Sequence, residues 1–237
     1  MDIITTRLGE LDCRLFGSST PQRAVILCHG YGAPGTDLVG LGPAMVEREP
    51  ALEDTLFVFP AAPLSLGGPA FFESRAWWQL DVVAIERAMA RGEFREFRTE
   101  LPEGLPAARR QLQTVVEEVL LKTGLTMDRL VLGGFSQGAM LTTDLTLRLE
   151  EPPAALCVLS GTLLCEDEWT RRAARRANLR VLQSHGRQDP ILPFQGAVWL
   201  QEMLETAGIA VEFHPFDGPH TIPESVLAAT SRFIREV

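Results

Sequence analysis

The sequence is poor in basic residues. Lysine and arginine together number 22 against 31 acidic residues, and Lys122 is the only lysine. The net charge of -9 offers no basic excess to neutralise phosphates, so we expect neither a nucleic-acid partner nor an anionic membrane surface. The apolar runs are also much shorter than the roughly 20 residues of a membrane-spanning helix, so no integral membrane contact is expected.

The cysteines lack the spacing of a zinc site or of a redox pair. No C-x-x-C motif occurs, and the thiols lie mostly inside apolar runs, at Cys13, Cys28, Cys157 and Cys165. This pattern predicts buried, reduced thiols and a reducing compartment. The N-terminus shows neither the basic nor the apolar part of a signal peptide, so we expect a cytoplasmic location.

Apolar runs of strand length alternate with segments of helical period. The runs cover residues 24–29, 55–60, 130–135, 155–160, 180–185 and 211–216. Such uniformly apolar runs are typical of strands buried on both faces of a parallel sheet. Residues 2–17 alternate and predict a small antiparallel hairpin. We therefore expect one α/β domain over residues 1–237, with a mostly parallel central sheet and helices on both faces.

The interval 67–104 is too long for an ordinary connection, and a helix is expected near residues 81–91. The interval is interpreted either as a surface excursion or as a cap over a site. Trp77 and Trp78 lie near its start. Two adjacent tryptophans in a segment rich in glycine and proline are hard to bury together, so we expect one to line a pocket, with ordinary core packing as the alternative.

The segment LVLGGFSQGAML, residues 130–141, contains a G-x-S-x-G motif centred on Ser136. Gly134 and Gly138 would permit a turn too tight for side chains, which lifts the serine hydroxyl above the sheet. The N–H of Gln137 would lie beside it at a helix N-terminus, where negative charge is favoured. The motif alone is not specific, so a nucleophile requires partners elsewhere.

A histidine base and a carboxylate are available later in the chain. His220 is the one of four histidines that lies in a glycine- and proline-rich loop after a strand and before the last helix. Asp189 follows the preceding strand, and the order Ser136, Asp189, His220 is that of an α/β-hydrolase triad. Asp217 is the rival acid, but it is only three residues from His220, too near to orient the ring easily.

The segment HGYGAPG after the first long apolar run could donate backbone N–H groups to an anion. It also matches the G-x-G-x-x-G dinucleotide fingerprint. Glu49 or Glu53 lies about 20 positions on, yet at the end of a helix rather than at the end of a second strand, which disfavours a nucleotide site. His29 and His185 have no carboxylate at ligand spacing, so we expect them to orient loops and expect no metal site.

The motifs GGFSQGAML, LCHGYGAPG, VFPAAPLSL, SRAWWQLD and QSHGRQDPILP together resemble the phospholipase/carboxylesterase family of serine α/β-hydrolases. This family includes bacterial carboxylesterases and acyl-protein thioesterases. The resemblance runs from about residue 22 to the end of the chain. It implies Ser136 as nucleophile, Asp189 and His220 as its partners, and the N–H groups of Tyr31 and Gln137 as the oxyanion hole.

The resemblance further implies an α/β-hydrolase fold and a cofactor-free carboxylesterase that acts on small esters. The apolar wall that the aromatic residues would form predicts acyl chains of short to medium length. Trp77 falls where the family has a tryptophan beside the acyl pocket, and Trp78 and Leu66 are the other expected substrate contacts. Asp81 is displaced from the usual motif, which leaves substrate choice open. A thioesterase, a lysophospholipase or a non-catalytic binding protein are the alternatives, as a monomer or a homodimer.

Overall fold

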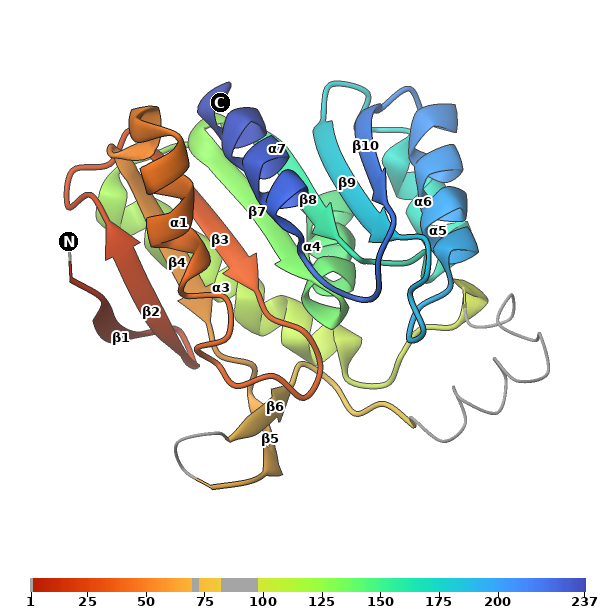
Figure 1. Cartoon of the computed structure of the whole chain (residues 1–237), viewed down its shortest axis with the longest axis horizontal. Coiled ribbons are helices and arrows are strands. Elements are labelled where there is room, and N and C mark those ends of the chain that lie inside the picture. Colours follow the sequence, from red (N-terminus) through yellow and green to blue (C-terminus); the bar gives the residue numbers. More distant parts are fainter. Residues whose placement is uncertain (1, 70–72, 82–97) are drawn as a thin grey trace.

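The computed structural model describes residues 2–69, 73–81 and 98–237, and an eight-stranded sheet runs through its centre (Figure 1). The strands in chain order are β1 Ile4–Leu8, β2 Leu11–Gly17, β3 Arg23–Cys28, β4 Thr55–Pro60, β7 Leu130–Phe135, β8 Ala155–Leu159, β9 Arg180–Gly186 and β10 Ala210–Phe216. Their spatial order is β1-β2-β4-β3-β7-β8-β9-β10. From β4 to β10 all neighbours pair in parallel, and the antiparallel hairpin β1–β2 lies at one edge.

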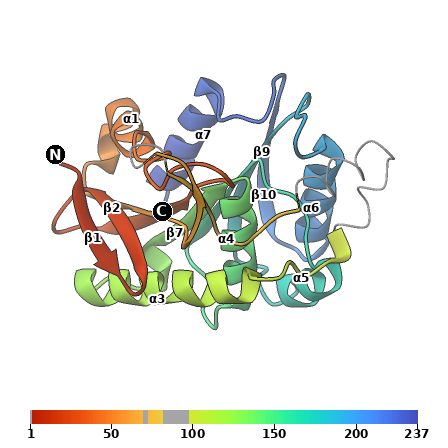
Figure 2. The ribbon, with the colours of Figure 1, turned by 90° about the horizontal axis from the view of Figure 1, so that it is seen from below.

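Helices cover both faces of this sheet. They are α1 Leu41–Arg48, α3 Leu105–Thr123, α4 Gln137–Arg148, α5 Glu166–Ala173, α6 Phe194–Thr206 and α7 Glu224–Arg235. Figure 2 shows α1 and α7 on one face and α3, α4 and α5 on the other. Each face has its own cluster of buried apolar side chains, and α6 contributes to that of α3 and α4. Within the described ranges, no helix has both the length and the apolar character to cross a membrane.

The α/β-hydrolase architecture and the N-terminal hairpin predicted from the sequence are confirmed. Burial on both faces is wrong for β10, which is partly exposed because it forms the edge of the sheet. Helix α5 begins at Glu166, where three acidic residues in its first turn stabilise the helix N-terminus. The helix expected near residues 81–91 lies, apart from Asp81, outside the described residues.

A second, two-stranded sheet was not expected. It pairs β5 Leu64–Gly67 with β6 Ser74–Ala76 in antiparallel fashion. Strand β5 has four residues and β6 has three, too few for their apolar pattern to predict a strand, and their register is irregular. This sheet leads into the tryptophan pair and lies below the carboxyl end of β4 in Figure 1.

The four cysteines are buried and form no disulfide, as predicted. Burial raises the pKa of Cys13 and of Cys157 to about 12. These thiols therefore stay protonated at neutral pH and behave as small apolar side chains.

Helix α4 is held to its neighbours by a buried carboxylate. Asp144 is 0% exposed and lies in the middle of this helix. It accepts hydrogen bonds from Arg109 Nη1 at 2.6 Å, Arg148 Nε at 2.9 Å and Trp169 Nε1 at 2.9 Å. Since these donors come from α3, α4 and α5, a single charge ties three helices together.

Replacing Asp144 by alanine should lower the free energy of unfolding by about 3 kcal/mol, because two partly buried guanidinium groups would lose their carboxylate. Urea denaturation of both proteins measures this difference. Asp12, exposed on β2, is the matched control, and Asp12→Ala should change stability by less than about 0.5 kcal/mol. Equal losses in the two variants would mean that the buried network contributes nothing.

Candidate active site

Ser136 lies at the sharp turn between β7 and α4. Its φ of 55° and ψ of -118° are strained for a residue with a side chain. The surrounding backbone holds this conformation: the Ser136 N–H donates to the Leu159 carbonyl at 2.9 Å, and its carbonyl accepts from the N–H groups of Ala139 and Met140. The serine therefore directly precedes the first turn of the helix, where the helix dipole favours negative charge.

Two glycines make this turn possible, as the sequence predicts. A Cβ atom on Gly138 would lie 2.0 Å from the carbonyl oxygen of Cys28, and one on Gly134 would lie 2.4 Å from the carbonyl carbon of Gly138. No side chain fits at either distance. The start of α4 thus packs directly against the carboxyl end of β3.

The structure brings His220 and Asp189 together. His220 Nδ1 lies 2.6 Å from Asp189 Oδ2, so Nδ1 carries a proton and Nε2 is available as a base. The loops that carry them are joined by the Gln188 N–H, which donates to the Gly218 carbonyl at 3.1 Å. The rings of His220 and Phe135 have centroids 4.6 Å apart, which places the imidazole beside the residue that precedes the turn serine.

No hydrogen bond joins His220 to Ser136 in the described part of the chain. Contacts of this kind in ligand-free enzymes are often long and tighten only when substrate binds. The ring contact with Phe135 places His220 near the serine turn without a direct hydrogen bond.

Asp189 is surrounded by donors. Its Oδ1 accepts from the N–H groups of Ile191 at 2.8 Å and Leu192 at 2.9 Å, and His185 Nε2 lies 3.2 Å from Oδ2. Burial raises the pKa of Asp189, but the hydrogen bonds from His185, His220 and the backbone outweigh it and hold the pKa well below its usual value. The carboxylate therefore stays ionised and can stabilise a protonated imidazole.

The rival acid lies elsewhere. The Asp217 side chain is 84% exposed, and its nearest ionic partner is Arg187, whose Nε lies 3.7 Å away. Asp189 is thus the carboxylate in contact with the candidate base.

His29 and His185 both bind loop backbone, as expected from the sequence. His185 Nε2 donates to the Leu192 carbonyl at 2.9 Å. His29 Nε2 accepts from the Ala62 N–H at 3.0 Å, which leaves the proton on Nδ1, 2.8 Å from the Gly30 carbonyl oxygen. Burial lowers the pKa of His29 to about 4, so the ring is neutral at physiological pH and can keep both contacts.

The loop after β3 runs alongside the serine. A Cβ atom on Gly30 would lie 3.3 Å from the Ser136 Cβ. Neither the Tyr31 N–H nor the Gln137 N–H donates to a backbone carbonyl within residues 2–69, 73–81 and 98–237. Gln137 begins α4, whose first N–H groups have no partner inside the helix. Such donors can stabilise an oxygen that becomes negatively charged next to the serine.

The side chain of Gln137 has a role that the sequence analysis missed. Its Oε1 accepts from the Trp77 N–H at 2.9 Å, and its Nε2 donates to the Trp78 carbonyl at 2.9 Å. Trp77 Nε1 in turn donates to the His29 carbonyl at 2.9 Å. The buried amide of a glutamine must form hydrogen bonds. The position of Gln137 in the first turn of a buried helix was therefore the signal that could have predicted such contacts.

The expected substrate contacts have different environments. Trp77 and Trp78 are each 1% exposed and belong to the core cluster beneath the sheet, which favours the core alternative for both rings. Leu66 is partly exposed on β5. Contact of these three residues with an acyl chain stays a prediction.

Sequence comparisons match this chain to one protein family. Residues 16–237 match the family model described as Phospholipase/Carboxylesterase. Acyl-protein thioesterase 1 of Kluyveromyces lactis is 30% identical over 192 residues, which cover 77% of this chain and 76% of that protein. Its counterpart in Eremothecium gossypii is 31% identical over 194 residues, which cover 78% of this chain and 74% of that protein.

Solved structures show the same fold. Esterase PE8 has a TM-score of 0.77 and 29% identity, and the match covers 96% of this chain and 99% of that chain. A carboxylesterase from Mesorhizobium loti, with a TM-score of 0.73, 16% identity and 99% of both chains covered, shares the fold alone. This chain belongs to the phospholipase/carboxylesterase family, a family of esterase- and thioesterase-type hydrolases.

Proposed function

We propose that this chain is a serine carboxylesterase that hydrolyses short- to medium-chain carboxylic esters through an acyl-enzyme. The observation that carries the proposal is the 2.6 Å hydrogen bond between His220 Nδ1 and Asp189 Oδ2 beside the strained turn at Ser136. A histidine held in this tautomer by a buried carboxylate is the arrangement that activates a serine hydroxyl.

In the proposed reaction, Ser136 Oγ attacks the ester carbonyl carbon while His220 Nε2 takes the hydroxyl proton. The carbonyl electron pair moves onto oxygen, where the N–H groups of Tyr31 and Gln137 stabilise it. His220 then gives its proton to the leaving alcohol as the ester C–O bond breaks, which leaves the acyl group on the serine. Water repeats both steps and releases the acid, and Asp189 stabilises the protonated imidazole throughout.

Thioester or lysophospholipid hydrolysis is the second candidate, since both use the same steps. Thioester hydrolysis is supported by the two relatives at 30% and 31% identity, which are both acyl-protein thioesterases. Rates with p-nitrophenyl esters and with acyl thioesters of matched chain length distinguish these substrates. A non-catalytic binding protein would turn over neither panel.

Ser136→Ala should lower kcat for ester hydrolysis by roughly 10⁴- to 10⁶-fold, because the nucleophile is removed while binding is left in place. A fluorophosphonate probe should label the wild type and not the variant. Thr162→Ala is the control, since this residue is equally buried and also carries a hydroxyl. Labelling that survives in Ser136→Ala would overturn the assignment.

Asp189→Asn should cost on the order of 10⁴-fold in kcat, because an amide no longer selects the imidazole tautomer with the proton on Nδ1. Asp217→Asn is the matched change at an exposed carboxylate and should leave kcat within about twofold. Steady-state kinetics on one p-nitrophenyl ester measures both. The reverse pattern would show that the acid is misassigned.

The neutral state of His29 predicts a pH dependence of stability. Its pKa is about 4 in the folded chain against an ordinary 6.5, so the unfolded chain binds a proton that the folded chain does not. Stability should therefore fall as the pH drops from 6.5 to 4.5, by roughly 2 kcal/mol from this residue. Urea unfolding of the wild type and His29→Gln should show their stability difference shrinking by that amount. A difference independent of pH would contradict it.

A further inference from the structure

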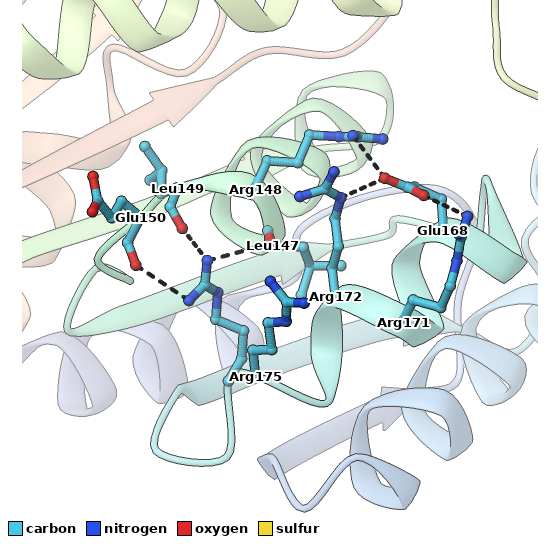
Figure 3. A pocket seen from close by; sticks show the side chains of 9 residues that line it. Leu147, Arg148, Leu149, Glu150, Glu168, Arg171, Arg172 and Arg175 are labelled. Atoms are coloured by element: carbon cyan, nitrogen blue, oxygen red, sulfur yellow. Dashed lines mark hydrogen bonds and ion pairs between the residues drawn. The ribbon is translucent and has the colours of Figure 1, made fainter.

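A pocket of about 410 Å³ lies at the end of α4 remote from Ser136 (Figure 3). Its lining comes from the end of α4 and from α5 with the turn that follows: Leu147, Arg148, Leu149, Glu150, Glu168, Arg171, Arg172, Arg175 and Arg176. Helix α4 spans 12 residues, so at about 1.5 Å per residue the pocket is roughly 18 Å from the serine. It forms no part of the candidate active site.

The pocket concentrates positive charge in an acidic protein. Five of its nine lining residues are arginines and two are glutamates, a net charge of +3 in a chain whose net charge is -9. Guanidinium groups remain charged at all physiological pH values. The charge is therefore a permanent property of this surface.

One carboxylate serves three of the arginines. Glu168 Oε1 lies 3.1 Å from Arg148 Nη1 and 2.5 Å from Arg172 Nε, and Glu168 Oε2 lies 2.6 Å from Arg171 Nη2. The dashed lines in Figure 3 mark these ion pairs. Arg148 is also neutralised by the buried Asp144. The shared carboxylate therefore leaves an excess of positive charge among the residues that line the pocket.

The remaining two arginines have no carboxylate in the described part of the chain. Arg176 donates to main-chain carbonyls at the end of α4, those of Leu147, Leu149 and Glu150. Its Nε is buried without a partner, and burial together with the charges of Arg172 and Arg175 lowers its pKa. Figure 3 draws no interaction to Arg175. Like charges thus lie near one another, and Arg176 Nε has no hydrogen-bond partner among the described residues.

We propose that this pocket binds a phosphate group that carries two or more negative charges, as in a phosphate monoester or a diphosphate. The planar fork of a guanidinium matches phosphate oxygens in pairs, and a group with two or three negative charges offsets most or all of the net charge of +3, where a monocarboxylate would offset only one charge. The volume lies within the usual range for small-ligand pockets. This site is independent of the hydrolytic function proposed above.

The alternative is that the arginines only compensate the negative C-terminal ends of α4 and α5. Replacement of Arg175 would then leave anion binding unchanged, and anion binding would not saturate. The overall negative charge also opposes any unspecific accumulation of anions. Saturable phosphate binding would consequently require the local cluster.

Isothermal titration calorimetry with pyrophosphate, at an ionic strength kept constant with sodium chloride, tests the site. The wild type should bind saturably, and Arg175→Gln should bind about tenfold more weakly because one charged donor is lost. Arg232→Gln removes the same charge from an exposed position on α7, across the sheet, and should bind like the wild type. Absence of saturable binding, or equal weakening in the two variants, would overturn the proposal.

Cosedimentation with phosphatidylcholine vesicles containing phosphatidic acid distinguishes the source of the phosphate. Pyrophosphate binding without vesicle binding supports a soluble phosphate ligand. Vesicle binding that requires Arg175 and is displaced by pyrophosphate supports a lipid headgroup. If Arg175→Gln leaves vesicle binding unchanged and pyrophosphate does not bind saturably, the interaction lies elsewhere on the protein and the proposal is overturned.

Discussion

The contact between the start of α4 and the end of β3 is the constraint on which the site depends. Gly138 lies so close to the Cys28 carbonyl that a Cβ would come within 2.0 Å of it. This approach forces Ser136 into positive φ and sets the loop that begins at His29 beside the serine. Without it, the loop after β3 and the start of α4 could not approach each other this closely.

The sheet supplies the other half of the site. Parallel strands end at a common edge, so the loops after β7, β9 and β10 meet there although they are distant in sequence. Asp189 then links two of these loops, because its carboxylate accepts from His185 and His220 as well as from its own loop backbone. The buried Asp189 carboxylate thus stays ionised and also fixes the tautomer of His220.

Helix α4 connects two regions of opposite character. Its N-terminus faces the candidate active site, and its C-terminus contributes to the arginine pocket (Figures 1 and 3). Asp144, midway along, anchors the helix to its neighbours through Arg109 of α3 and Trp169 of α5. The net charge of -9 conceals this arrangement, because composition averages over a surface on which arginines from two helices have been brought together.

Consecutive residues determined the strands of the central sheet, the glycine-bracketed turn at Ser136 and the chain order Ser136, Asp189, His220, since apolar runs, steric demands and chain order are all local properties. Exposure at the sheet edge, the contact distance between His220 and Asp189, and the amide contacts of Gln137 were decided only by the tertiary structure. The same is true of the tryptophan pair, whose burial depends on a helix some 60 positions away. Each of these features joins groups far apart in the chain, and their proximity follows from packing rather than from spacing.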